Sequence, residues 1–250
     1  MPSSDSVTPS HDHSLDLTIV VPCKNEEERI VATLHTIARA LKSLPWRYEV
    51  LVIDDGSSDH TAERVETFLR ENPAAPVRLH RNPKNLGLSR SYVDGAFLAR
   101  GKYYRLTCGD DAEPEEAMRT ILSKVGEADI IIPYHSSLTG KSAIRIFVSK
   151  LYTALVNLFS GNSIHYYNGC PVHLRYHVLR WHSYAFGFGC QADFVTRLID
   201  EGATYVEVAV DVRHVEKESA SSPFKVRNIV STVHTLAEIF RRRINKILFG

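Results

Sequence analysis

The sequence predicts an α/β protein whose core is an open, doubly wound, mostly parallel sheet. Two short apolar runs, LTIVV at 17–21 and EVLVI at 49–53, indicate buried parallel strands because their apolar residues are almost continuous. Between them, residues 26–44 carry apolar side chains at helical spacing. A strand, a helix and a second strand in this order form the unit from which such sheets are built.

The same alternation continues along the first half of the chain. The further elements that we expect are helices at 61–69 and 89–99 and strands at 77–80, 102–106 and 129–133. A chain of 250 residues is long enough to bury this core in one domain, with or without an appended lobe.

After residue 133 the pattern changes to amphipathic helices. Residues 144–159 and about 229–248 each carry an apolar stripe with basic residues close to it. An apolar stripe usually packs on a core, whereas a basic amphipathic helix can also dock on a membrane surface, and both alternatives stay open. We therefore divide the chain into a disordered leader (1–14), a main domain (15–228) and a C-terminal basic amphipathic helix (229–250).

Composition and charge narrow the possible partners and location. Thirty basic and twenty-nine acidic residues leave a formal net charge of +1, so the overall charge does not indicate a nucleic-acid partner. The four cysteines form no CxxC pair, which argues against a zinc knuckle and indicates a reduced, cytosolic chain.

Residues 1–14 lack the apolar segment of a secretory signal, and no uninterrupted run of about 18 apolar residues occurs. We expect a cytoplasmic protein without a membrane-spanning helix, peripheral on the cytoplasmic membrane face if its amphipathic helices dock there.

Three polar loops follow predicted strands, at 22–26, 54–59 and 109–114. Ligands of doubly wound sheets bind at the carboxyl ends of the strands, so these loops predict a site at one sheet edge. In the second loop, carboxylates can accept hydrogen bonds from a base or a ribose, although Ser58 or Asp59 could equally cap a helix. In the third, Asp110 and Asp111 form either a polar turn or a site for Mg²⁺ or Mn²⁺ that holds a diphosphate.

Four segments in order resemble the landmarks of family 2 glycosyltransferases, which have the nucleotide-diphospho-sugar fold called GT-A. They are IVVPCKNEEERI, VLVIDDGSSDHT, NLGLSRSYVDGA and CGDDAEP, and together they cover about residues 17–135. The resemblance implies that the loop at 22–26 and Asp55 of the loop at 54–59 hold the nucleotide base and ribose, and that the acidic motif holds the metal and the diphosphate. The nucleotide-sugar residues that it implies are Pro22, Lys24, Asn25, Glu26, Asp54, Asp55, Gly87 and Asp110.

The acidic motif departs from the Asp-x-Asp pattern that is frequent in this family. Cys108 or Gly109 stands where the first carboxylate would be. We therefore expect Asp111 to be the main metal ligand and Asp110 to assist it or to contact the ribose.

The second half resembles the polyprenyl-phosphate branch of the family, which includes the dolichol-phosphate mannose synthases. The resemblance places Asp193 as a general base or as a group that orients the acceptor, with a solvated helix carboxylate as the alternative. It also implies that Arg213 and Lys225 offset charge on the leaving diphosphate, and that His214 is a possible metal ligand. Residues 216–225 form either a mobile lid or an ordinary surface loop.

These features predict a metal-dependent, inverting glycosyltransferase. It would move a sugar from a GDP- or UDP-sugar to an acceptor, preferably a polyprenyl phosphate, with Mg²⁺ or Mn²⁺ as cofactor and no nucleic acid as partner.

Two alternative functions remain. A sugar-nucleotide nucleotidyltransferase would need a glycine-rich basic loop after the first strand, where this chain has PCKNE. A non-catalytic nucleotide-sugar-binding module would keep the base pocket and lose the metal site.

Overall fold

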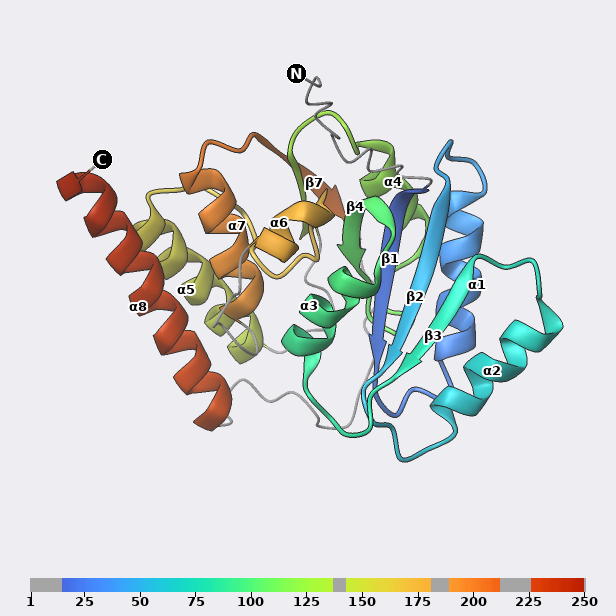
Figure 1. Ribbon diagram of the computed structural model, residues 1–250. Helices are drawn as coiled ribbons and strands as arrows, with labels where there is room; N and C mark the ends of the chain where they lie inside the picture. Colours follow the sequence, from blue (N-terminus) through green and yellow to red (C-terminus); the bar gives the residue numbers. More distant parts are fainter. Residues whose placement is uncertain (1–14, 137–142, 181–188, 212–225, 250) are drawn as a thin grey trace, which may run out of the picture.

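The computed structural model describes residues 15–136, 143–180, 189–211 and 226–249. Its centre is a seven-stranded sheet with the order β3-β2-β1-β4-β6-β5-β7. The strands are β1 (Leu15–Cys23), β2 (Tyr48–Asp54), β3 (Val77–Arg81), β4 (Gly101–Leu106), β5 (Ile130–His135), β6 (Val172–Leu174) and β7 (Tyr205–Val210). Only β6 pairs antiparallel to its neighbours, β4 and β5. The predicted α/β class and the mostly parallel sheet are confirmed (Figure 1).

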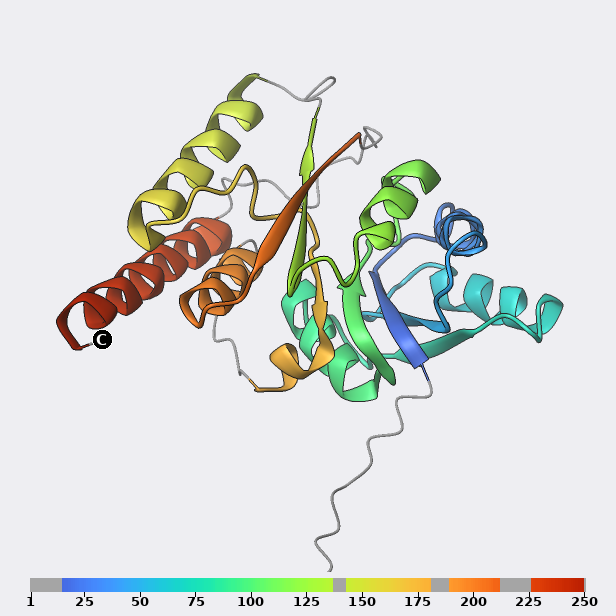
Figure 2. The same cartoon turned by 90° about the horizontal axis from the view of Figure 1, so that it is seen from above.

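Helices cover both faces of the sheet (Figure 2). The helices are α1 (Ile30–Leu41), α2 (Thr61–Glu71), α3 (Leu88–Leu98), α4 (Glu115–Ser123), α5 (Ala143–Ser160), α6 (Arg175–Arg180), α7 (Cys190–Asp200) and α8 (Val226–Phe249). One core contains side chains of α1, α2 and α4, and the other contains side chains of α3 and α5 to α8. Within β1, Ile19 and Val21 point into the first core and Val20 into the second, so a buried strand needs apolar residues at every position.

Three elements were not predicted: β6, α4 and α6, the last with only six residues. The short strand β6 has only three residues, and such a segment has too few positions to show a period. Helix α4 did have local signals, because Pro114 precedes it and Glu115 and Glu116 lie in its first turn, where acidic residues interact favourably with the helix dipole.

Helix α8 begins at Val226, so the predicted division at residue 229 falls inside a helix. The helix packs against α5, where the rings of Phe159 and Phe240 lie 5.4 Å apart, and also against α7. Helix α5 ends at Ser160, close to the predicted end.

The exclusion of a membrane-spanning helix was too strong. Over its 18 residues, α5 is long and apolar enough to cross a membrane by length and composition, although Arg145 and Lys150 interrupt the apolar run. A search for uninterrupted runs misses such a helix because it rejects any charge. Core helices of water-soluble proteins meet the same criterion, so this finding assigns no location.

Candidate active site

The first two predicted loops lie together at the carboxyl ends of β1 and β2. The Asn25 backbone N–H donates to Ser57 Oγ over 3.0 Å, and the Ser58 N–H donates to Asn25 Oδ1 over 2.9 Å. Asn25 adopts a left-handed backbone with φ of 55°, a conformation that asparagine tolerates better than most residues. Of its neighbours in the first loop, Pro22 and Glu26 are buried and Lys24 is exposed.

Asp59 connects the second loop to the first loop and to the start of α2. Its Oδ1 accepts the Thr61 backbone N–H over 3.0 Å, and its Oδ2 accepts the Glu27 N–H over 3.2 Å. The N-cap residue of α2 is His60, which makes no side-chain cap hydrogen bond, so neither Ser58 nor Asp59 is the N-cap that the alternative predicted.

Asp55 is the centre of the second loop, although only 5% of it is exposed. Its Oδ1 accepts hydrogen bonds from Asn82 Nδ2 at 2.8 Å and from the Leu86 N–H at 2.9 Å. Its Oδ2 accepts the Gly87 N–H at 2.8 Å. Asp55 thus holds the segment between β3 and α3 against the end of β2.

This segment also approaches the second loop closely enough to require a glycine. A Cβ on Gly56 would lie 2.6 Å from the Lys84 carbonyl carbon, and Gly56 has φ of 68°. Asp54, the neighbour of Asp55, turns back to accept the Ser57 N–H over 3.1 Å. The loops after β1, β2 and β3 therefore form one connected surface.

The third loop places its two aspartates in different surroundings. Asp111 Oδ1 accepts the Thr36 hydroxyl over 2.9 Å, and the Asp111 N–H donates to Thr33 Oγ1 over 3.0 Å, so this residue faces α1. Asp110 instead lines a cavity, and burial raises the pKa of its carboxyl. Asp110 is therefore the aspartate that lines the cavity, whereas Asp111 faces α1.

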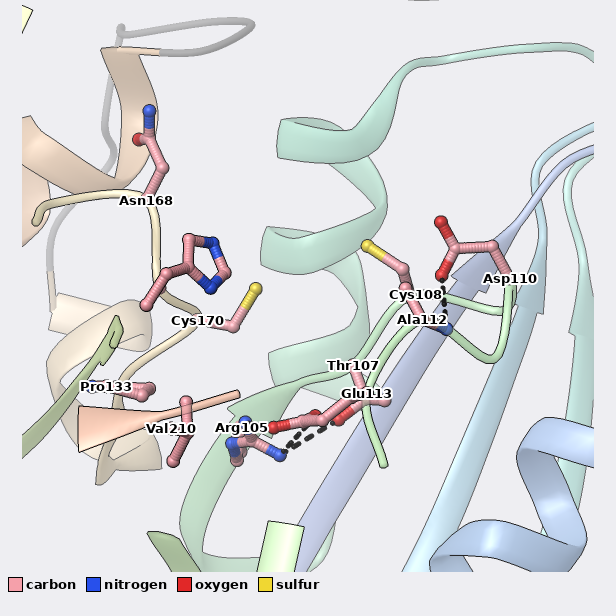
Figure 3. Close-up of a pocket in the computed structure, with 12 residues that line it drawn as sticks. Arg105, Thr107, Cys108, Asp110, Ala112, Glu113, Pro133, Asn168, Cys170 and Val210 are labelled. Atoms are coloured by element: carbon pink, nitrogen blue, oxygen red, sulfur yellow. Dashed lines mark hydrogen bonds and ion pairs between the residues drawn. The ribbon is translucent and has the colours of Figure 1, made fainter. Parts of the chain in front are cut away.

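The cavity has a volume of about 170 Å³ and lies where the chain leaves β4, β5 and β7 (Figure 3). Its lining residues are Arg105, Thr107, Cys108, Asp110, Ala112, Glu113, Pro133, His135, Asn168, Gly169, Cys170 and Val210. Because Asp110 lies in the loop after β4 and β4 pairs with β1, the cavity and the first loop share the carboxyl edge of the parallel strands.

Arg105 and Glu113 form an ion pair in the cavity wall. Arg105 is almost fully buried, and its Nη1 and Nη2 donate to the two Glu113 oxygens at 2.9 and 2.5 Å. Such a two-point pair fixes both side chains. Since both Glu113 oxygens already accept from Arg105, Glu113 is not a free carboxylate for a cation.

Two thiols from separate loops meet at the same cavity. The neighbouring Cys108 thiol, together with the nearby Arg105 guanidinium and the Gln191 amide, lowers the pKa of Cys170. The neighbouring Cys170 sulfur raises the pKa of Cys108.

Asp193 lies apart from the cavity. It is 2% exposed, and its carboxylate is paired with Arg197 at 3.0 Å and with Arg242 of α8. The Arg242 guanidinium also donates to Thr196 Oγ1 over 2.6 Å. The alternative of a solvated helix carboxylate is therefore wrong, because Asp193 is buried between α7 and α8.

The model of the family described as "Glycosyl transferase family 2" matches residues 18–170. The chain belongs to glycosyl transferase family 2. The match includes all three predicted loops, the Asn82–Gly87 segment and the Cys170 end of the cavity.

Curated relatives of this family 2 chain act on polyprenyl phosphates, according to their names. A dolichyl-phosphate beta-glucosyltransferase of Dictyostelium discoideum is 33% identical over 101 residues, which are 38% of this chain and 31% of that protein. A dodecaprenyl-phosphate galacturonate synthase of Rhizobium johnstonii is 26% identical over 64% of this chain and 47% of its own. An undecaprenyl-phosphate 4-deoxy-4-formamido-L-arabinose transferase of Shewanella sediminis is 26% identical over 90% and 67%. The chain thus spans between about a third and two thirds of the length of these relatives.

Solved structures of similar shape have the GT-A fold, and their low identities make them evidence for the fold alone. Glucosyl-3-phosphoglycerate synthase from Mycobacterium tuberculosis, in complex with UDP, has a TM-score of 0.66 and 15% identity over 91% of this chain and 82% of that one. The mannosyltransferase PcManGT from Pyrobaculum calidifontis, in complex with GDP-Man and Mn²⁺, has a TM-score of 0.67 and 16% identity over 91% and 64%.

The described residues supply few ligands for a divalent cation. Among the residues that the structure describes, no group of three or more His, Cys, Asp or Glu side chains could hold a metal by itself. Mg²⁺ and Mn²⁺ commonly bind through one or two carboxylates and substrate phosphates, and Asp110 supplies one such carboxylate. The predicted ligand His214 and the predicted cations Arg213 and Lys225 lie outside the described residues.

Sequence reasoning missed the Arg105–Glu113 pair, His135 and Asn82. An arginine in a strand whose neighbours are apolar is a usable signal, because such a buried charge requires a partner. No comparable signal marks Asn82, since its contact with Asp55 depends on how the loops after β2 and β3 meet.

Proposed function

We propose that this family 2 glycosyltransferase moves a sugar from a nucleoside-diphosphate donor to a polyprenyl phosphate. The observation that carries the proposal is the continuous site at one sheet edge. The loops of Asn25 and Asp55 lie at the ends of β1 and β2, and Asp110 follows β4, which pairs with β1. The names of the curated relatives support the acceptor class.

The donor base and ribose occupy the surface formed by the loops after β1, β2 and β3. Asp55 keeps the Asn82–Gly87 segment in place and offers Oδ2, which accepts the Gly87 N–H, to the donor. Pro22, Lys24, Asn25, Glu26 and Asp54 complete this surface in the proposal. The proposed donor is a UDP-sugar or a GDP-sugar, because solved structures of the same fold contain UDP or GDP-Man.

Asp110 faces the donor diphosphate at the cavity. A bound Mg²⁺ or Mn²⁺ would be held by Asp110 and the diphosphate oxygens, and it would stabilise the charge on the leaving nucleoside diphosphate. Arg213, Lys225 and His214 remain proposed contributors on the diphosphate side. The Arg105–Glu113 pair positions the loop that carries Asp110 and takes no part in the chemistry.

An ionised acceptor phosphate needs little help from a base. One of its oxygens forms the new bond to the anomeric carbon while the bond from that carbon to the diphosphate breaks, and attack from the opposite face inverts the anomeric centre. No proton has to leave the attacking oxygen. The buried position of Asp193 is compatible with this reaction, and its proposed role is to position α7 and α8.

The lipid acceptor explains the apolar surface of α5 and α8. On α5, Phe147 is 66% and Leu158 72% exposed; on α8, Ile247 is 65% exposed. The exposed Arg241 and Lys246 of α8 suit anionic headgroups. In this proposal the two helices lie on the cytoplasmic membrane face as a peripheral contact and present the cavity to the acceptor phosphate.

A thermal-shift screen tests the donor and the metal together. The full chain is heated with UDP- and GDP-sugars, with and without Mn²⁺, because a ligand that binds the folded state raises the melting temperature. One donor should stabilise the wild type more with Mn²⁺ than without it. Asp110→Asn should lose that extra shift, whereas the matched variant Asp111→Asn should retain it.

The outcomes separate the alternatives. If Asp111→Asn and not Asp110→Asn loses the metal-dependent shift, the ligand assignment is wrong. A donor shift that is independent of Mn²⁺, without sugar transfer to a polyprenyl phosphate in vesicles, would instead favour a non-catalytic binding module.

A further inference from the structure

Cys108 and Cys170 come from different parts of the chain and face each other across the cavity (Figure 3). Cys108 follows β4, and Cys170 precedes β6, which pairs antiparallel to β4. Both residues line the cavity, and both cysteines are free. The proposed transfer reaction uses neither sulfur.

The Cys170 side of this pair is held firmly. A Cβ on Gly169 would lie 1.8 Å from the Pro133 carbonyl oxygen, so the backbone here is pressed against β5. The Cys170 N–H donates to Gln191 Oε1 over 3.1 Å, and Gln191 Nε2 donates to Cys170 Sγ over 3.5 Å. Cys170 also has φ of 54°, an uncommon conformation that these contacts maintain.

The Cys108 side is accessible. Cys108 is exposed, Cys170 is half-buried, and the other two cysteines, Cys23 and Cys190, are buried. A small oxidant in solution can therefore reach the Cys108–Cys170 pair before it reaches the buried thiols. Exposure and a neighbouring second thiol are the features of cysteines that oxidise reversibly.

We propose that Cys108 and Cys170 form a reversible disulfide when a peroxide reaches the cavity, and that this bond closes the site. One thiolate attacks the peroxide and becomes a sulfenic acid, with release of water or an alcohol. The second sulfur then attacks the sulfenic sulfur, and a second oxygen leaves as water. Two thiols are oxidised, the peroxide is reduced, and a dithiol can reverse the change by exchange.

The bond would act on the site through Asp110. A disulfide holds its two sulfurs about 2.05 Å apart, so it would tie the loop after β4 to the Gly169–Cys170 backbone. Asp110 lies two positions after Cys108, so it loses the freedom to adjust to a ligand, and the cross-link occupies the space between the two walls of the cavity. The inference goes beyond the proposed function, because formation of the bond does not depend on the reaction that the site performs.

Peptide mapping of the full chain tests the bond directly. The protein is treated with hydrogen peroxide, remaining thiols are alkylated, and the non-reduced digest is analysed by mass spectrometry. We expect a peptide pair joined through Cys108 and Cys170 that dithiothreitol separates. Cys108→Ser and Cys170→Ser should each abolish the pair, whereas the matched buried variant Cys190→Ser should retain it.

Several results would overturn the proposal. They are a cross-link to Cys23 or Cys190, a dimer joined through Cys108, or oxidation of Cys108 without any cross-link, provided that circular dichroism shows folded protein. Closure of the site is measured separately from formation of the bond. Oxidation should remove the metal-dependent thermal shift that the donor causes in the protein, and dithiothreitol should restore it. An unchanged shift in fully cross-linked protein would refute closure while leaving the bond and the proposed transfer intact.

Discussion

Asp55 gives the sharpest prediction, because one buried carboxylate accepts three hydrogen bonds from the segment between β3 and α3. Asp55→Ala leaves two backbone donors, Leu86 N–H and Gly87 N–H, without their acceptor, and it also removes the partner of Asn82 Nδ2. A hydrogen bond to a charged group contributes about 1.5–3 kcal/mol, and water can partly replace the acceptor in a surface loop. We therefore expect a loss of about 2–4 kcal/mol in the free energy of unfolding.

Urea denaturation of the purified full chain measures this loss. Asp55→Asn retains the volume but presents an amide N–H₂ to one of the donors, so it should cost less than Asp55→Ala and still be destabilising. Asp94→Asn is the control, because Asp94 pairs with the exposed Arg90 on the surface of α3 and such surface pairs contribute little to stability.

The same substitution tests the donor site. Since the Asn82–Gly87 segment loses its anchor, Asp55→Ala should raise KM for the donor more than it lowers kcat. A stability within about 0.5 kcal/mol of the wild type would refute the role of Asp55 as an anchor. An unchanged KM would refute its role in donor binding.

Three further predictions concern other parts of the molecule. Burial lowers the pKa of His173 to about 3, below its ordinary 6.5, so its stabilising contribution is complete above pH 6.5 and decreases as the pH falls towards 3. Between pH 6.5 and 5 the free energy of unfolding should fall by up to about 1.4 kcal/mol per unit more in the wild type than in His173→Gln; equal slopes would contradict this. Asp193→Ala leaves the Arg242 guanidinium without its buried partner and should cost about 3–5 kcal/mol of stability, whereas a loss of kcat at wild-type stability would show that Asp193 is a base. Exchanging Phe147 and Leu158 for serine should reduce flotation with anionic vesicles at an unchanged melting temperature, and undiminished flotation would argue against membrane docking by α5.

The sequence by itself determined the fold class and the region of the site. Buried parallel strands need nearly continuous apolar runs, and helices between them need apolar residues at helical spacing, so β1, α1 and β2 were recognisable from local pattern. The position of a loop directly after a strand then places it at a known sheet edge. For this reason the loops of Asn25, Asp55 and Asp110 could be placed together before any contact was known.

Only the tertiary structure decided which neighbouring side chain faces the cavity. Asp110 and Asp111 are adjacent and chemically alike, and their directions depend on the left-handed backbone of Asp111 and on Thr36, which lies 75 positions away in the sequence. Asp193 is a similar case, because Arg242, 49 positions away, neutralises it inside the α7–α8 contact. Local periodicity reports which face of an element is buried, but the partner of a buried polar group comes from a distant part of the chain, and only packing brings the two together.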